Sequence, residues 1–310
     1  MTSFSPKIDR ISENIIYLLS LDSRKNVSQL AQRLSLPRKV VENRCKRLYH
    51  SNFIKPLLIV NHEQMVKSSV LIKQATFDPL LIKKIQQSSL LIKLKETLGM
   101  YDLSILLFAR DQQEMNGMIS KISKIFHKST LSLDVIHHSF EDTLGYKSFC
   151  HEPTLYQKYS MLEQNKRPLT GEESKVISAL SQKPNIKMNE LIKSTNYGYN
   201  KLKNIISLLL KQRIMRFSVD PDYTKLGLEF HNILVKINIA RSREFENNIM
   251  KHPRVHWIKK GIGRWDYILS VTARDVSEFI DITKEIRTQN NKSILDFSTL
   301  ISKINVMRQY

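Results

Sequence analysis

The sequence predicts an α+β fold in which two winged helix-turn-helix domains alternate with two ferredoxin-like βαββαβ domains. Two repeats predict this organisation. GMYDLSILLFARD at 99–111 recurs as GRWDYILSVTARD at 263–275, and residues 27–55 align without gaps to 188–216. Copies separated by 164 and 161 positions indicate duplication of a whole domain unit, because solenoid repeats have periods of about 20–50 residues.

The repeated stretch predicts a turn, a strand and the start of a helix in each copy. Gly99 and Gly263 permit a turn that a Cβ atom would resist. The residues that follow alternate as in a strand with one apolar face. These apolar positions are Leu103, Ile105, Leu107 and Ala109 in the first copy and Tyr267, Leu269, Val271 and Ala273 in the second. Each strand ends at an acidic N-cap followed by a glutamate, Asp111–Glu114 and Asp275–Glu278, which is typical of a capping box.

Three short helical patterns precede each repeated stretch. In the first set, an apolar face covers residues 9–21, Ser28 is the expected cap of a second helix, and Pro37 is expected at the start of a third. The third helix is strongly basic, and Glu42 is its one acid. Three short helices with a basic third helix are typical of a helix-turn-helix domain.

The strand and helix patterns place the domain boundaries. We expect helix-turn-helix domains at 1–62 and 169–228 and ferredoxin-like domains at 63–138 and 229–310. Residues 139–168 contain two prolines and the polar run EQNKRP, which predicts an extension of the preceding strand followed by a linker.

Composition narrows the function classes. The formal net charge of +20 and the pI near 9.8 suggest a polyanionic partner, nucleic acid before membrane, although a merely soluble basic surface is an open alternative. No apolar run reaches the roughly 18–20 residues of a membrane span, and the first residues lack the apolar core of a signal peptide. Cys45 and Cys150 cannot build a disulfide framework, so a cytoplasmic location is expected.

Several of these motifs resemble one known family. In the first half they are Asp9, the pattern Val41-x-x-Arg44-Cys45-x-x-Leu48 and Phe53-Ile54. In the second half they are His252-Pro253-x-Val255 and Gly263-Arg264-Trp265-Asp266-Tyr267. In order and spacing the chain resembles a tandem fusion of two Lrp/AsnC (feast/famine) transcription regulators, each a helix-turn-helix plus a RAM-type effector domain. The resemblance implies transcriptional regulation through DNA binding, with a C-terminal effector and oligomerisation domain.

The third helix of each set is the expected DNA-binding helix. Helix-turn-helix geometry favours Arg38 and Lys39 for base edges, with the other basic residues on the DNA backbone. A solvated basic face is the alternative, and for the second helix a scaffold role is nearly as well supported because Ile205 replaces Arg44. The candidate DNA-binding residues are Arg38, Lys39, Arg44, Lys46 and Arg47 in the first helix and Tyr199, Asn200, Lys201, Lys203 and Asn204 in the second.

The two glycine turns are the expected effector site, since regulators of this family bind small ligands, often amino acids, near this loop. The candidate effector-binding residues are Gly99, Tyr101, Asp102, Gly263, Trp265 and Asp266. The alternatives are turn carboxylates that bond local amides and aromatic side chains that belong to the core.

The expected partners are double-stranded DNA and an amino-acid-like effector, without a membrane, a metal or a cofactor. The apolar strand faces around Leu106, Phe108 and Ile268 predict that the two ferredoxin-like domains pack together as an intramolecular pseudo-dimer, which could join a higher homo-oligomer. His137-His138 and Cys150-His151 lack a complete metal-ligand set.

Three functions compete at this point. The first is a DNA-binding regulator with an effector, which predicts that the chain is not an enzyme. The fold also resembles paired or fused sirohaem decarboxylase subunits, which need histidines and arginines facing a large cavity; His256 and Arg264 do not establish that pattern. The third is an architectural DNA-binding protein without an effector.

Overall fold

The described chain divides into two units, each built from both halves of the sequence. The structure is a computed structural model that describes residues 8–60, 66–76, 78–86, 93–156 and 167–307. Met1–Glu63 and Thr143–Leu228 form one unit, here called the helical unit. Gln64–Asp142 and Glu229–Tyr310 form the other, here called the barrel unit. The two three-helix segments, expected as separate domains, therefore share one unit.

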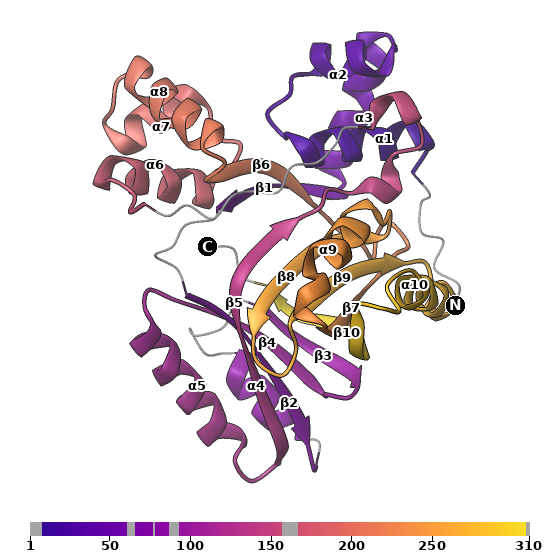
Figure 1. Cartoon of the computed structure of the whole chain (residues 1–310). Coiled ribbons are helices and arrows are strands. Elements are labelled where there is room, and N and C mark those ends of the chain that lie inside the picture. Colours follow the sequence, from indigo (N-terminus) through magenta and orange to yellow (C-terminus); the bar gives the residue numbers. More distant parts are fainter. Residues whose placement is uncertain (1–7, 61–65, 77, 87–92, 157–166, 308–310) are drawn as a thin grey trace. The chain divides into compact units, whose positions relative to one another are not determined.

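The first segment of the helical unit contains three helices and a strand: α1 (Arg10–Leu21), α2 (Val27–Leu34), α3 (Arg38–His50) and β1 (Ile54–Val60) (Figure 1). Asp9 caps α1 by accepting a hydrogen bond from the Ser12 amide. Asn26, not the expected Ser28, caps α2 in a capping box with Gln29. Ser28 already lies within the first turn of the helix. Asn26, which precedes the helix, is therefore the residue whose side chain accepts a hydrogen bond from a free first-turn amide.

The second segment repeats this order with α6 (Gly171–Gln182), α7 (Met188–Thr195), α8 (Tyr199–Lys211) and β6 (Met215–Pro221). Thr170 and Glu173 form a capping box at the start of α6. Strands β1 and β6 pair antiparallel, with Ile54 opposite Pro221 and Val60 opposite Met215. The extended segments after the two helix triplets are therefore hydrogen-bonded to each other.

Part of the expected linker belongs to the core of the helical unit. The preceding strand extends to Thr143, and two short helical turns follow, η1 (Lys147–Phe149) and η2 (Pro153–Leu155). Tyr146, Phe149 and Leu155 are buried in the same cluster as α1–α3. Burying their apolar area is favourable, which explains why this stretch packs against the core and does not form an extended linker. Residues 157–166 of the expected linker lie outside the described part.

The barrel unit contains two βαββαβ halves. The first consists of β2 (Val66–Gln74), α4 (Pro79–Gln86), β3 (Lys93–Gly99), β4 (Leu103–Ala109), α5 (Gln112–Phe126) and β5 (Thr130–Thr143). The second consists of β7 (Glu229–Ile237), η3 (Ile239–Arg241), α9 (Ser242–Lys251), β8 (Val255–Ile262), β9 (Tyr267–Ala273), α10 (Val276–Gln289) and β10 (Ile294–Met307). Asp111 and Asp275 cap α5 and α10 as predicted, but Glu114 and Glu278 accept hydrogen bonds from the amides of Arg110 and Arg274, so the reciprocal bond of a capping box does not form.

The eight strands of this unit close into a barrel in the order β10-β3-β4-β2-β5-β8-β9-β7. Strands β5 and β10 make the closure, because each pairs with the first strand of its own half and with a strand of the other half, β8 or β3. We expected two sheets packed face to face, whereas the halves also join at their edges. The last strands, at 14 residues each, are long enough to pair beyond their own sheet.

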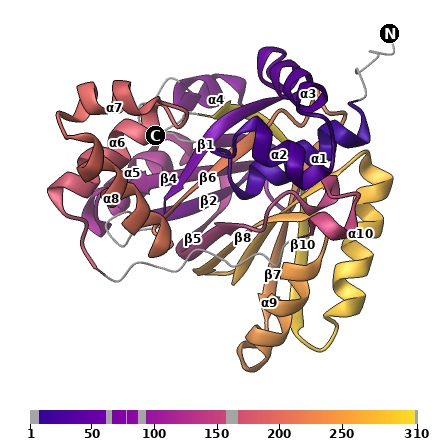
Figure 2. The ribbon, with the colours of Figure 1, turned by 90° about the horizontal axis from the view of Figure 1, so that it is seen from above.

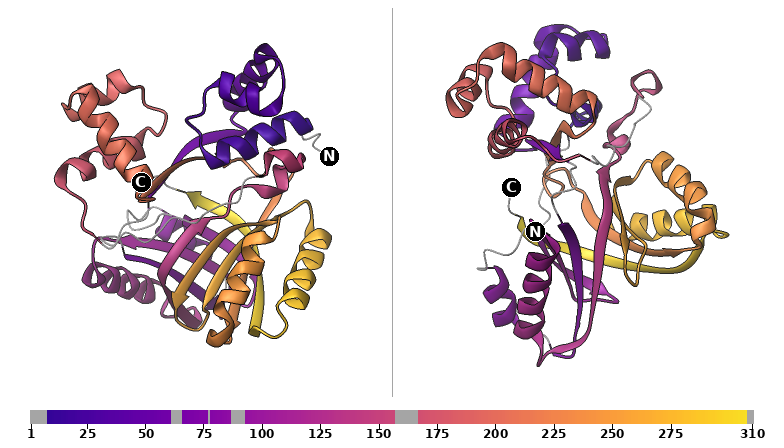
Figure 3. Two further views of the ribbon diagram at one scale, coloured as in Figure 1. Left: turned by 45° about the horizontal axis from the view of Figure 1, so that its top comes forward. Right: turned by 60° about the vertical axis from the view of Figure 1, so that its left-hand side comes forward.

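Helices cover the outside of the barrel, and alternate strand residues face its interior. Figure 3 shows α4 and α5 against the strands of the first half, and Figure 2 shows α9 and α10 beside the strands of the second. Beneath α4 and α5 lies a cluster that includes Val70, Ile105 and Met115. A second, interior cluster draws residues from both halves: Leu71, Tyr101, Ile136, Leu234, Trp265, Ile268 and Leu300. The interior is therefore apolar at the end where the two glycine turns lie.

Among the described helices, none combines the length and the apolar character that crossing a membrane requires.

Candidate functional site

Helix α3 buries one apolar face and exposes a basic one. Val41, Cys45 and Leu48 lie in the core of the first segment. Burial raises the pKa of the Cys45 thiol to about 11, so this thiol stays neutral and is a packing group. The basic side chains on the exposed face are Arg38, Lys39, Lys46 and Arg47.

Arg44, although predicted to contact DNA, anchors α3 to the start of α1. Its Nε and Nη2 atoms donate to Oδ2 of Asp9 at 3.0 and 2.8 Å. Burial alone would raise the pKa of Asp9, but hydrogen bonds from Arg44 and Ser12 lower it to about 2. Lys46 is also paired, with Glu42 at 2.6 Å. Within the described residues, Arg38, Lys39 and Arg47 have no carboxylate within 4 Å, so no ion pair there competes with an outside anionic partner.

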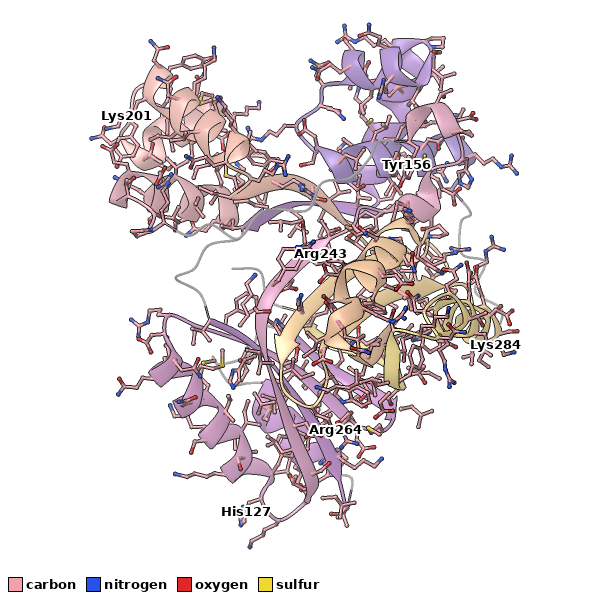
Figure 4. All side chains as sticks on the ribbon, viewed as in Figure 1. His127, Tyr156, Lys201, Arg243, Arg264 and Lys284 are labelled. Carbon is pink, nitrogen blue, oxygen red and sulfur yellow. The ribbon has the colours of Figure 1, made fainter. Side chains whose placement is uncertain are left out.

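Helix α8 presents a different exposed face. Tyr199, Asn200, Lys203 and Asn204 are exposed there, and α8 contains no acidic residue. Lys201, which lies at the outer edge of this segment in Figure 4, is ion-paired with Glu172 and lies 4.6 Å above the ring of Tyr197.

The residues that would anchor α8 as Arg44 anchors α3 are replaced. Ile205, at the position of Arg44, packs half-buried against the core of the second segment. Thr170 stands at the position of Asp9 and caps α6. Helices α3 and α8 therefore occupy the same place in the element order of their segments, but their exposed faces carry different side chains.

The aspartates of the two glycine turns make equivalent contacts. The Asp102 carboxylate accepts hydrogen bonds from Lys73 Nζ at 2.9 Å and from the Gln74 amide at 2.7 Å. The Asp266 carboxylate accepts them from Lys236 Nζ at 2.8 Å and from the Ile237 amide at 2.9 Å. In each half the turn is thereby tied to the end of the first strand.

The glycines of these turns lie against the other half of the barrel. A Cβ atom on Gly99 would stand 2.4 Å from the carbonyl oxygen of Thr299 in β10, and one on Gly263 would stand 2.4 Å from that of Val135 in β5. Gly99 also has a φ of +138°, whereas Gly263 is not in the left-handed region. The turn explanation given for both glycines therefore holds for Gly99 alone, and at Gly263 the close approach of backbone requires glycine.

Tyr101 and Trp265 are fully buried at the apolar end of the barrel interior. Trp265 Nε1 donates to the Tyr101 hydroxyl at 3.1 Å, and this hydroxyl donates to Asp134 at 2.5 Å. Burial and the Asp134 carboxylate raise the pKa of Tyr101 to about 12. These contacts favour a structural role for both turns, and effector binding by the turn residues stays a prediction.

The other end of the barrel interior is basic, a feature that the sequence patterns did not predict. Lys67, Lys95 and Lys259 face inward from β2, β3 and β8, and His138 and Glu141 come from β5. A signal exists in the sequence, because each lysine occupies a strand position that alternates with core residues such as Leu94 and Ile258. Only the closure of the barrel turns those positions into an interior.

The residues considered for a decarboxylase are not grouped. His256 is buried and shares a hydrogen bond of 2.6 Å with the Thr272 hydroxyl. Arg264, labelled on the barrel unit in Figure 4, is half-exposed. Its guanidinium lies 3.6 Å from Asp134 Oδ2 and 5.6 Å from the centre of the Trp265 ring. In the part of the chain that the structure describes, no three His, Cys, Asp or Glu side chains lie close enough to hold a metal ion.

Residues 232–308, which form most of the second half of the barrel, match the family model described as the Lrp/AsnC ligand binding domain. The resemblance drawn from the sequence motifs is thus confirmed. Residues 232–308 are therefore of the Lrp/AsnC ligand-binding type. Curated proteins yielded no match.

Solved structures with similar folds include an enzyme. The siroheme decarboxylase NirDL matches with a TM-score of 0.62 and 13% identity, over 96% of this chain and 93% of its own. Its complex with an iron-uroporphyrin III analogue gives a TM-score of 0.60 and 12% identity, covering 97% and 94% of the two chains. AsnC from E. coli matches 43% of this chain over 93% of its own, with 17% identity and a TM-score of 0.37.

The NirDL match overturns one prediction made from the sequence, namely that the chain is not an enzyme. An enzyme therefore shares this fold, and the match covers nearly the whole of both chains. One fold supports both ligand binding and chemistry, so a basic helix-turn-helix pattern does not exclude catalysis.

Proposed function

We propose that the chain is a sequence-specific DNA-binding transcription regulator of the Lrp/AsnC type, modulated by a small-molecule effector and acting in the cytoplasm. In this proposal α2–α3 and α7–α8 are two helix-turn-helix pairs, and β1 and β6 are their wings. The observation that carries the proposal is the exposed face of α3, where Arg38, Lys39 and Arg47 have no carboxylate within 4 Å in the described residues.

The physical argument concerns charge and position. Arg38 and Lys39 occupy the first turn of α3, and residues at this end of a recognition helix contact base edges. Arg47 lies two turns further on, where a contact to the DNA backbone is expected. Arg44 is committed to Asp9, so we propose that it supports α3 instead of reading a base directly.

The two helix-turn-helix pairs are proposed to act as the unequal heads of an intramolecular pseudo-dimer. Residues 37–48 would bind a strong half-site and residues 198–209 a weaker one, because α8 offers fewer free cations and has Ile205 in place of Arg44. Tyr199, Asn200 and Asn204 supply hydrogen-bonding groups there, and asparagine can bind adenine in a bidentate manner.

The experiment begins with duplexes selected from a random pool by the wild-type protein. Their affinity is measured against salt concentration, and the bound site is footprinted. We expect log Kd to depend linearly on log salt. Replacing Arg38, Lys39 and Arg47 by alanine should lower the slope by about 0.9 for each phosphate that the variant no longer neutralises. Lys121→Ala, an exposed lysine on α5, is the control and should change neither slope nor footprint.

Three outcomes decide the proposal. Loss of protection on one half-site after substitution of α3, and on the other after substitution of α8, supports unequal heads. Equal loss on both half-sites from either set refutes the pseudo-dimer. Salt-dependent binding without a selected site would indicate an architectural DNA-binding protein, and salt-independent binding would refute the nucleic-acid interface.

A second candidate is an enzyme that acts on a carboxylate-bearing substrate, as a sirohaem decarboxylase does. The observation in its favour is the basic end of the barrel interior, where Lys67, Lys95 and Lys259 could hold carboxylates. Incubation with sirohaem followed by mass analysis tests it directly. Loss of carbon dioxide from the substrate supports this candidate, and unchanged sirohaem at stoichiometric protein excludes that substrate.

A further inference from the structure

The basic end of the barrel interior holds more positive than negative charge. Lys67 and Lys259 approach the same carboxylate, Glu141, at 3.5 and 3.3 Å. Glu141 is buried, which by itself would raise its pKa, but the charges of Lys259 and Lys67 keep its pKa below the usual range. One carboxylate is thus shared by two ammonium groups.

Lys95 adds a third ammonium group without an acidic partner. It is 5% exposed, and within the described residues its hydrogen bond goes to a neutral acceptor, Oδ1 of Asn232, at 3.2 Å. Its Nζ lies 4.3 Å from the centre of the Phe230 ring. Burial and the charges of Lys93 and Lys259 lower the pKa of Lys95 well below its ordinary value. Burying an ammonium group among like charges is unfavourable unless an anion joins it.

His138 provides an independent sign of a missing partner. Its side chain is 1% exposed, and one ring nitrogen, Nε2, shares a hydrogen bond of 2.9 Å with the Ser69 hydroxyl. The other nitrogen, Nδ1, is buried and has no hydrogen-bond partner among the described residues. A carboxylate oxygen of Glu141 is 4.0 Å away from it, beyond hydrogen-bond distance. Buried polar atoms nearly always have a partner in a native protein, so an unsatisfied one points to a bound molecule.

These groups come together from four strands and both halves of the barrel. Lys67, Lys95 and Lys259 belong to β2, β3 and β8, and His138 belongs to β5. Aromatic rings lie beside the ammonium groups, since Lys67 is also 5.0 Å from the centre of the Phe108 ring. The aromatic rings and the surrounding strands keep the lysine ammonium groups inside the barrel. The cluster is therefore preorganised to bind an anion.

We propose that the lysine cluster of the barrel interior (Lys67, Lys95, Lys259 and His138) binds a compact small-molecule dianion that carries carboxylate or phosphate groups. With all three lysines protonated against the carboxylate of Glu141, these four groups carry a formal excess of two positive charges, which a dianion neutralises. The Nδ1 atom of His138 then gains a hydrogen-bond partner. The role of this ligand as an effector rests on the proposed function, whereas its binding does not.

Binding is measured on the full chain without DNA, with succinate and with inorganic phosphate as probes. Calorimetric titration and thermal unfolding are performed at one ionic strength, held constant with sodium chloride. We expect saturable binding of one dianion per chain and a Tm that rises with ligand concentration, because a ligand that binds only the folded state stabilises it. Stronger binding of one probe identifies the headgroup chemistry. The proposal is overturned if neither probe gives heat on titration and sodium chloride shifts the Tm as much as the two probes do.

Lys95→Met gives the sharpest variant, because it removes the ammonium group and keeps an unbranched apolar chain. We expect at least about tenfold weaker dianion binding, as for loss of a charge-assisted hydrogen bond. We also expect a higher Tm of the ligand-free protein, because a buried cation near Lys93 and Lys259 is removed. A purely structural lysine would lower the Tm instead. Wild-type affinity in this variant overturns the proposal, and Lys121→Met on α5 is the matched control.

Glu141→Gln tests the charge balance in the opposite direction. Without the carboxylate the cluster gains one net positive charge, so dianion affinity should rise while the ligand-free Tm falls. If this variant does not fold, Lys259→Met replaces it, with weaker binding expected. Weaker binding by Glu141→Gln, or unchanged binding by Lys259→Met, contradicts the proposal. A protein that binds the dianion but no DNA refutes the proposed regulator and leaves this site standing.

Discussion

The two three-helix segments of the helical unit reach similar backbones by different contacts. In the first, the Asp9–Arg44 pair ties the start of α1 to the middle of α3. In the second, Thr170 and Ile205 occupy those positions. The start of α6 is stabilised instead by Glu173, which accepts hydrogen bonds from Arg167 at 2.7 and 2.8 Å and from the Thr170 amide at 2.9 Å.

The difference shows which contacts can diverge without changing the fold. The Asp9 side chain is 51% exposed, so its ion pair contributes about 0–1 kcal/mol. The Glu173 side chain is 5% exposed and bonded to several donors, so its loss costs more. The barrel turns differ less: Asp102 and Asp266 make the same two types of bond, and each ties its turn to the end of the first strand of its own half.

The largest effect that would sharpen this comparison is expected at the turn glycines. Gly263→Ala places a Cβ atom against the Val135 carbonyl oxygen, and Gly99→Ala adds an unfavourable φ to the same kind of clash. We expect the free energy of unfolding to fall by about 2–3 kcal/mol for Gly263→Ala and by about 1 kcal/mol more for Gly99→Ala. Urea denaturation measures both.

Gly117→Ala on α5 is the control for these two variants. No atom lies within 4 Å of its added Cβ, so replacing a helical glycine should stabilise the protein by up to about 1 kcal/mol. Equal stability changes at Gly99 and Gly117 would contradict the close approach of the two halves.

The next effect compares the two anchors of the helical unit. Glu173→Gln leaves the Arg167 guanidinium without its carboxylate and should cost about 2 kcal/mol, whereas Asp9→Asn should cost about 0.5–1 kcal/mol. Urea denaturation in low and high salt separates them, because the exposed Asp9 pair is screened more strongly. A larger loss for Asp9→Asn would reverse the ranking of the two anchors.

The two units are also expected to differ in pH dependence. Burial first, and then the Lys259 charge, lower the pKa of His138 from 6.5 to about 3, so the unfolded state binds its proton first and the barrel unit loses stability as pH falls from 6.5 towards 3. Glu173, with a pKa lowered from 4.5 to about 2 by Arg167, stabilises the helical unit above pH 4.5 and loses this effect towards pH 2.

Asp9 behaves like Glu173, with its contribution present above pH 3.8 and lost towards about pH 2. His138→Gln should therefore flatten the stability profile between pH 6.5 and 3, and Glu173→Gln should flatten it between pH 4.5 and 2. Thermal unfolding of both variants across pH 2–7 measures this. Identical stability profiles for the two variants would show that neither side chain determines the pH dependence of stability in the range predicted for it.

The sequence by itself determined the local structure of this protein. Periodicity predicted the order of helices and strands, and the capping motifs at Asp111 and Asp275 predicted the start of α5 and α10 correctly. These features depend on neighbouring residues, so a short stretch contains the information. The Lrp/AsnC resemblance could likewise be recognised from the sequence, because its motifs are short segments of fixed spacing.

Tertiary structure alone decided what distant residues do to one another. Closure through β5–β8 and β10–β3 depends on register and strand length across the two halves, and it turned Lys67, Lys95 and Lys259 from ordinary strand lysines into one interior cluster. Arg44, for which DNA contact stays a prediction, pairs with Asp9, 35 positions earlier. Such pairings carry no local signal, because their energy comes from burial and electrostatics that exist only once the chain has folded.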